Sequence, residues 1–345
     1  MTNKKKLSII LSTGTYQLPN EKYLGVELTM ENLFFIGIDS GGTKTAITVI
    51  DKNQNEILSF QTGTGHYLQI GFDGLETLLQ EITTKVLTQL NITEKNIGYI
   101  FAGIPGYGEI KEDQLKIDAI TKKVWNNISF KVGNDMEAGW AGSLACEPGI
   151  NIIAGTGAIG FGVNSQGLQS RSSGWGPICG DEGSAYWVGK KALEVFTKEA
   201  DGRYEKTPIY EIFKKELNLK DDFDLIHLIH NQYSLDRGKI AKLSLLVYKA
   251  ALENDKYALK IFKEAGEEIG LMIKAIINKI DFGNEIIKVS YTGGVFQSGD
   301  FIFEPLKNYL KNYGLNAEII KPKYSAVMGS AIYGLKLYNE KNGGL

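Results

Sequence analysis

The sequence is poor in the residues that build cross-linked or membrane-spanning proteins. Only two cysteines, Cys146 and Cys179, occur in 345 residues, too few for a disulfide framework, so a reducing cytoplasm is the expected location. No stretch comes near the run of about 18 apolar residues that a membrane-spanning helix needs. The net charge is −2, which predicts no basic surface for nucleic acid. We therefore expect a protein that binds neither nucleic acid nor membrane.

Proline is also scarce, at 7 residues, whereas glycine reaches 40, a combination that predicts many tight turns rather than disorder. Hydrophobic residues make up 43% of a chain long enough for two domains. The apolar run after the lysines at 4–6 is too short for a secretory leader. Residues 1–32 are predicted to form a poorly packed extension, with Met30 as a candidate for the natural start.

The stretch from Phe34 to Asp51 predicts an apolar strand, a glycine-rich turn and a second β-branched strand. Such a turn directs backbone N–H groups toward one point, an arrangement that binds phosphate. Asp39 ends the first strand, so its carboxylate faces the same point, where a magnesium ion would bridge it to phosphate oxygens. The alternative is an ordinary hairpin whose glycines only supply positive φ angles.

A second hairpin repeats this pattern over 150–163, and its turn is Gly155-Thr156-Gly157. This repetition predicts two similar domains whose turns converge on one cleft. A third glycine-rich turn follows an apolar strand at 292–294. The run 155–160 matches G-x-G-x-x-G, but it leads into a strand rather than a helix, so a dinucleotide site is not expected.

Periodicity predicts the remaining elements. Further strands are expected at 56–62, 97–103, 128–132, 286–292 and 317–320. Helices are expected at 73–90, 112–125, 136–145, 181–196, 240–252, 258–280, 299–312 and 325–339, with 203–280 largely helical.

Asp135 follows a strand in the middle of the chain, between two of the phosphate turns. A carboxylate there could accept the proton of an attacking hydroxyl, as the catalytic aspartate of a kinase does. The alternative is that Asp135 only caps the helix that begins near Met136.

The segment 172–187 is the most distinctive, with Trp175, Trp187, several glycines and the acids Asp181 and Glu182. Aromatic walls, backbone donors and carboxylates suit a sugar site. With this segment the sequence resembles the N-acetylglucosamine kinases of the BadF/BadG/BcrA/BcrD ATPase family, in the superfamily of actin, the heat-shock chaperone ATPases and hexokinase. The motifs that carry the resemblance span about 33–335 and are 37–44, 134–138, 154–157, 174–176, 180–187 and 293–295.

The resemblance implies an α/β fold with two RNase H-like, actin-like ATPase domains around a nucleotide cleft. The first domain would cover 33–143 and the second 144–345, with a helical insertion in the second and the last helix packed back on the first. It also implies ATP and Mg²⁺ as cofactors, an amino sugar as substrate and a homodimer.

The resemblance further implies the roles of individual residues. Asp135 matches the base that deprotonates the sugar 6-hydroxyl, and Asp39 would sit near magnesium. The ATP-binding residues would be Ser40, Gly41, Gly42, Thr43, Lys44, Thr156, Gly157, Ala158, Ala250, Gly293, Gly294 and Ser298. The sugar-binding residues would be Gly65, His66, Tyr67, Asp135, Gly174, Trp175, Gly176 and Asp181. Glu182 is a candidate for a structural role at the start of its helix.

The sequence departs from the family pattern in two places; the turn tolerates the first, and the second leaves the sugar open. Ser40 replaces a glycine of the first turn, and Gly65 and Tyr67 stand where the vertebrate enzymes have Asn and Trp. Gly65 is expected to make space, so N-acetylmuramic acid or glucosamine stand beside N-acetylglucosamine as substrates.

The sequence is also compatible with two rival functions. One is an iron–sulfur ATPase activator, although Cys146 and Cys179 are expected to be buried thiols. The other is a non-catalytic sugar sensor, which the presence of both Asp39 and Asp135 argues against.

Overall fold

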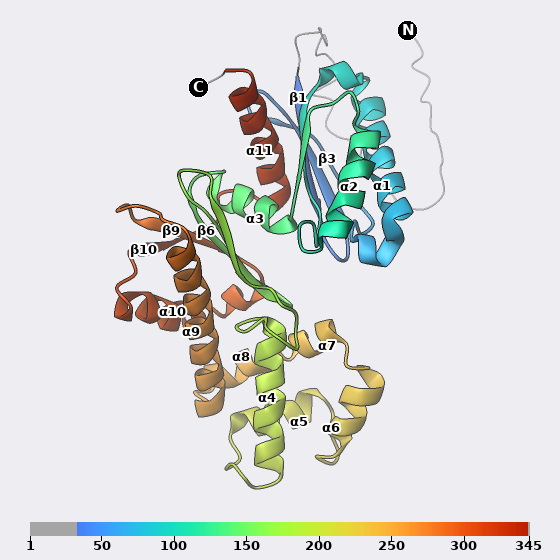
Figure 1. Ribbon diagram of the computed structural model, residues 1–345. Helices are drawn as coiled ribbons and strands as arrows, with labels where there is room; N and C mark the ends of the chain where they lie inside the picture. Colours follow the sequence, from blue (N-terminus) through green and yellow to red (C-terminus); the bar gives the residue numbers. More distant parts are fainter. Residues whose placement is uncertain (1–32, 344–345) are drawn as a thin grey trace, which may run out of the picture.

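The computed structural model describes residues 33–343, so the extension predicted over 1–32, with Met30, lies outside the described residues. Figure 1 shows two separate β-sheets, each flanked by helices, with helix α3 (Asp135–Leu144) between them. Helix α3 packs against strands of both sheets. No helix within 33–343 is both long and apolar enough to cross a membrane.

The first sheet has five strands in the order β3-β2-β1-β4-β5. Their bounds are β1 Phe34–Ser40, β2 Thr45–Asp51, β3 Glu56–Thr62, β4 Ile97–Gly103 and β5 Phe130–Gly133. Strands β1, β2 and β3 run antiparallel, whereas β4 and β5 join β1 in parallel. The carboxyl ends of β1, β4 and β5 therefore meet at one edge of the sheet, where ligands bind in open α/β sheets.

The second sheet repeats this plan, in the order β10-β9-β6-β7-β8. Its strands are β6 Gly149–Ala154, β7 Ala158–Val163, β8 Gln169–Ser173, β9 Ile287–Thr292 and β10 Ala317–Ile320. Strands β6, β7 and β8 are antiparallel, and β9 and β10 are parallel to β6. The predicted α/β fold with two repeated sheet units is confirmed. Strand β8 was not predicted, because the sequence QSRSS holds no apolar residue.

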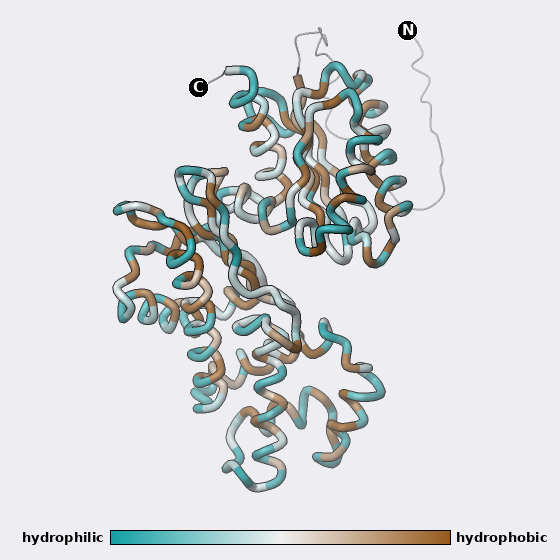
Figure 2. Tube along the Cα trace, in the orientation of Figure 1, coloured by the Kyte–Doolittle hydropathy of each residue, from teal (hydrophilic) through white to brown (hydrophobic). Residues whose placement is uncertain are grey.

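Alternation along β1 explains how helices cover both faces of the first sheet. Phe34, Ile36 and Ile38 pack into the core under α1 (Tyr67–Leu90) and α2 (Lys111–Val124). Phe35 points the other way, into a cluster with α3 and α11 (Ala326–Lys341). A Cβ on Gly37 would meet the backbone of α11, so the last helix lies directly on β1. Figure 2 shows the strands of the first sheet as largely apolar segments.

Helix α1 begins before the predicted residue 73, because a turn over 67–70 precedes a break at Gly71, where φ is 74°. The short helix η2 (Glu94–Asn96) then leads into β4. In the second domain, α9 (Lys256–Lys279) and α10 (Asp300–Asn312) share a core with β6 and β9.

The helices between β8 and α9 form an insertion that Figure 1 places beyond the second sheet, and they cover part of the region 203–280 that is predicted to be helical. The elements of the insertion are α4 Ala185–Ala200, α5 Pro208–Glu216, α6 Asp224–His227, η3 Leu228–Gln232, α7 Arg237–Lys242 and α8 Ser244–Leu252. Helix α4 begins at Ala185 rather than at Asp181, and its cap is Ser184, whose hydroxyl accepts from the N–H of Trp187 at 3.1 Å. The prediction that the two acids lie in its first turn is wrong, because Asp181 and Gly183 have left-handed φ angles that end any helix there.

Candidate active site

Hydrogen bonds fix the first phosphate turn, residues 40–44, on one side, and three of its residues are exposed on the other. The N–H of Gly41 donates to the carbonyl of Lys44 at 2.8 Å, and the hydroxyl of Thr64 donates to the carbonyl of Gly41 at 2.8 Å. Ser40 is buried, whereas Gly42, Thr43 and Lys44 are exposed. The exposed backbone N–H groups and the hydroxyl of Thr43 are thus available to a phosphate.

Asp39 lies at the carboxyl end of β1, beside Gly103 at the end of β4. The pKa of Asp39 is raised to about 7, mainly by burial and also by the nearby charge of Asp135, against the opposing effect of Lys44. A desolvated carboxylate beside a phosphate cradle is the donor that a magnesium ion takes when phosphate oxygens supply its other ligands. The residues present therefore fit a magnesium ion next to the first turn.

Asp135 lies in the first turn of α3, at the carboxyl end of β5. The helix cap is Asn134, whose side chain accepts from the N–H of Met136 at 3.1 Å, so the alternative in which Asp135 is the cap is wrong. The pKa of Asp135 is raised to about 6, mainly by burial and also by Glu109, while backbone N–H groups and Arg171 oppose the rise. The structure thus brings Asp39 and Asp135, 96 positions apart in the sequence, to one edge of the sheet, close enough for one charge to affect the other.

Glu109 and Arg171 form an ion pair across the two domains. Arg171 is on β8, and its Nη1 donates to the Oε1 of Glu109, in the loop after β4, at 2.9 Å. Its Nη2 donates to the carbonyl of Gly174 at 3.2 Å, and its guanidinium lies 5.5 Å from the ring centre of Trp175. Sequence reasoning missed both members of this pair, because no local pattern links them. Arg171 connects the loop of Trp175 with the surroundings of Asp135.

The second phosphate turn is closed by the N–H of Gly155, which donates to the carbonyl of Gly157 at 2.9 Å. Thr156 is exposed at its tip and Ala158 is buried beneath it. The carboxylate of Asp181 accepts from the N–H of Ala158 at 3.3 Å. Asp181, predicted to contact the sugar, therefore lies against the phosphate turn.

The third turn packs on the second. Gly293 has a φ of 106°, and a Cβ there would meet the backbone of Ala154 and Gly155. The short helix η4 (Gly294–Ser298) follows and borders a cavity of about 140 Å³. Its lining consists of Val188, Ser244, Leu245, Tyr248, Phe262, Gly294, Val295, Gln297 and Ser298. Of the residues predicted to bind ATP, Gly294 and Ser298 border this cavity, while Ala250 is buried in the core.

The predicted sugar loop over 65–67 packs closely against the first turn. A Cβ on Gly65 would lie 2.8 Å from the Cβ of Ser40, so the expectation that Gly65 leaves space for a larger sugar is wrong. Ser40 itself fills that space. Tyr67 is buried, and its hydroxyl donates to Asp113 at 3.1 Å. The Nδ1 of His66 is buried without a hydrogen-bond partner among the described residues.

The loop from Gly174 to Asp181 is open to solvent at its centre. Trp175 is 72% exposed and Ile178 is 93% exposed, so an apolar surface is presented beside Arg171. Gly174 and Gly176 have left-handed φ angles that favour glycine. An exposed indole on a glycine-supported loop is a surface that suits the apolar face of a sugar ring.

The cysteines differ in environment. Cys146 is buried, and burial raises the pKa of its thiol to about 12, which disfavours the thiolate that binds metals. Cys179 is exposed, so the expectation that both thiols are buried is wrong for Cys179.

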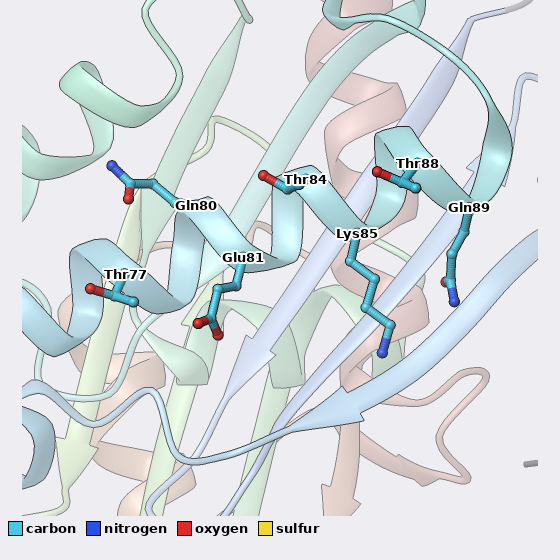
Figure 3. Close-up of a pocket in the computed structure, with 7 residues that line it drawn as sticks. All are labelled: Thr77, Gln80, Glu81, Thr84, Lys85, Thr88 and Gln89. Atoms are coloured by element: carbon cyan, nitrogen blue, oxygen red, sulfur yellow. The ribbon is translucent and has the colours of Figure 1, made fainter. Parts of the chain in front are cut away.

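A larger cavity of about 420 Å³ lies elsewhere, along the outer side of α1. Figure 3 shows that the labelled side chains around it, from Thr77 to Gln89, all project from this one helix. They include none of the predicted site residues, and we do not assign this cavity to the active site.

One family model covers most of this chain. The model of the BadF/BadG/BcrA/BcrD ATPase family matches residues 36–334. The N-acetylmuramic acid/N-acetylglucosamine kinase of Clostridium acetobutylicum is 30% identical over 299 residues, covering 87% of this chain and 97% of that protein. The N-acetyl-D-glucosamine kinase of Dictyostelium discoideum is 30% identical over 319 residues, covering 89% and 99%.

A solved structure has the same fold. It is that of a protein from Chromobacterium violaceum provisionally named an N-acetylglucosamine kinase, with a TM-score of 0.62 and 21% identity, covering 88% of this chain and 99% of that one. Sequence motifs, the repeated sheets and these similarities lead to one assignment. The chain belongs to the BadF/BadG/BcrA/BcrD ATPase family.

Proposed function

We propose that this protein is an ATP-dependent amino-sugar kinase that phosphorylates the 6-hydroxyl of N-acetylglucosamine or a close relative, with Asp135 as general base. The observation that carries the proposal is the position of Asp135. Its carboxylate is not used as a helix cap, lies at the same sheet edge as Asp39 and has a pKa raised to about 6. The names of the two 30% identical relatives support an amino sugar as the acceptor.

In this proposal Asp135 accepts the proton of the sugar hydroxyl as it attacks the terminal phosphate. A base with a pKa near 6 is ionised at neutral pH and is more basic than an ordinary aspartate. The three glycine-rich turns would bind the phosphates and adenosine, and Asp39 would hold the metal. Magnesium, when bound, neutralises charge on the phosphate oxygens. A cytoplasmic location and a homodimer stay predictions from the sequence.

The nature of the sugar is tested by a coupled assay of ADP release with N-acetylglucosamine, N-acetylmuramic acid, glucosamine and glucose. We expect one of the amino sugars to give the highest kcat/KM. The kcat/KM for glucose should be at least about tenfold lower, because glucose lacks the amino or acetamido group that such a site binds. Asp135→Asn serves as the background. If no sugar raises ADP release above that background, the proposed function is wrong.

The ion pair between Glu109 and Arg171 allows the base to be tested by its pH dependence. Because the carboxylate must be ionised to act, kcat/KM should rise with pH through about 6 and then level off. Glu109→Gln removes a charge that raises the pKa of Asp135, so the midpoint should move to lower pH. Arg171→Gln removes a charge that lowers this pKa, so the midpoint should move to higher pH.

The measurement is kcat/KM between pH 5 and 8.5 for both variants. Glu112→Gln, an exposed acid in the first turn of α2, is the control and should leave the midpoint unchanged. Shifts in the same direction for the two members of the ion pair would contradict Asp135 as the titrating base.

The rival functions are less compatible with these contacts. An iron–sulfur cluster shared between two subunits needs accessible thiolates. Cys146 is only 2% exposed, and the pKa of its thiol is raised to about 12. A protein purified under anaerobic conditions should therefore be colourless. A sensor without turnover would not need two carboxylates with raised pKa values at one sheet edge.

A further inference from the structure

Arg237, the first residue of α7, lies against the second phosphate turn, although it comes from the helical insertion. A Cβ placed on Gly157 would collide with the Nη2 of Arg237 and would lie 3.0 Å from the Oδ2 of Asp181. Arg237 and Asp181 form an ion pair through these same two atoms. The turn, the acid and the guanidinium are therefore in direct contact.

Arg237 has N–H groups that Asp181 does not occupy. A guanidinium carries five N–H donors, and Asp181 takes only those of Nη2 among the contacts of the described residues. The Nε of Arg237 is buried and has no partner in the described part of the chain. A buried N–H of a charged group that makes no hydrogen bond destabilises the folded protein. The free N–H therefore indicates that a further acceptor binds here.

Asp181 is held independently of Arg237. Its other oxygen, Oδ1, accepts from the N–H of Ala158, and its side chain is 4% exposed. Helix α7 is fixed too, because Gly189 of α4 packs directly on the carbonyl of Ile240. Asp181 thus fixes the guanidinium, and the packing of α7 on α4 fixes the backbone that carries it. The side chain of Arg237 is nevertheless 40% exposed.

We infer that Arg237 binds the terminal phosphate of the nucleotide at the Gly155–Gly157 turn. This inference rests on the proposed use of that turn for ATP phosphates, and it adds a charged residue from the insertion to the site. Lys44 belongs to the first turn, and Arg237 is the guanidinium that lies against Gly157 in the second. An arginine fork suits phosphate oxygens because two parallel N–H groups can meet two oxygens. Asp181 orients this fork from behind.

The test is nucleotide binding without sugar, measured by calorimetry with Mg²⁺ and either ADP or a non-hydrolysable ATP analogue. Arg237→Gln should weaken binding of the ATP analogue about ten- to hundred-fold, the loss of charge-assisted hydrogen bonds, and change ADP binding less than about threefold. Arg237→Lys should recover part of the loss. Asp181→Asn keeps the guanidinium but removes the carboxylate that orients it, so binding of the ATP analogue should weaken less than in Arg237→Gln, with ADP binding unchanged. Lys239→Gln, an exposed cation two residues further on, is the control and should bind both nucleotides normally.

Two results would overturn the inference. If Arg237→Gln and Asp181→Asn both lower the melting temperature and neither alters the preference for the ATP analogue, the pair is only structural. If nucleotide binding is unchanged but the KM for sugar rises, Arg237 belongs to the sugar site. Because the binding assay contains no sugar, a selective loss of ATP-analogue binding supports the inference even if no amino sugar is a substrate.

Discussion

Asp135→Asn should reduce sugar phosphorylation by about 10²- to 10⁴-fold, because the amide cannot accept the proton of the hydroxyl. Binding of ATP should change little, since the three phosphate and nucleotide turns are untouched. The substitution should not lower the stability of the folded protein. The pKa of Asp135 is raised in the folded protein, so its ionised form is disfavoured there, and stability falls as pH rises from 3.8 past about 6. At pH 7.5 the neutral amide should therefore leave the melting temperature unchanged or higher.

Glu137→Gln is the matched control, two residues further along the same helix. Glu137 pairs with Lys131 at 2.8 Å, and Lys131 also donates to the hydroxyl of Tyr333 on α11 at 2.9 Å. Weakening this largely buried contact should cost about 1–3 kcal/mol in stability and leave kcat nearly intact. The two variants thus separate chemistry from folding. Equal losses of ATP binding and phosphorylation in Asp135→Asn would contradict its role as base.

Gly329→Ala should be strongly destabilising, because α3 and α11 touch through their backbones at this residue. A Cβ on Gly329 would overlap the backbone of Gly142 and lie 2.5 Å from the carbonyl carbon of Ala141. Gly142 in turn packs on the backbone of Ser325 and Ala326. Backbone atoms cannot move aside as a side chain can, so we expect a loss of about 3 kcal/mol, the upper end for overpacking. In a domain of this size that is a fall of about 10 °C in the melting temperature.

Gly334→Ala, on the same helix, is the control. Its nearest neighbour would be 3.6 Å from the new methyl group, an ordinary van der Waals distance. Alanine is better than glycine inside a helix by about 1 kcal/mol, so the melting temperature should stay or rise. Both variants are measured by thermal unfolding. Because α3 also carries Asp135, activity in Gly329→Ala should be lost at temperatures where Gly334→Ala is still active. Similar unfolding of the two variants would show that the close helix contact does not decide stability.

Most of the fold could be predicted from the sequence. The strands around Ile36 and Ile152 are marked by apolar runs, and the phosphate turns by glycines directly after them. Strand β8 was missed because its residues are polar, and the start of α4 was misplaced by the acids before Ser184. In both cases the backbone follows contacts with distant segments rather than local preference.

By itself, the sequence determined most of the strands, turns and helices in their order, the repetition of the sheet unit and the candidates Asp39 and Asp135. These depend on side-chain periodicity and turn chemistry, which are encoded within a few residues. Only the tertiary structure decided which side chains meet. The pairs of Glu109 with Arg171 and of Asp181 with Arg237 join residues 62 and 56 positions apart. Such contacts arise when two sheets and an insertion pack together, so no local pattern records them.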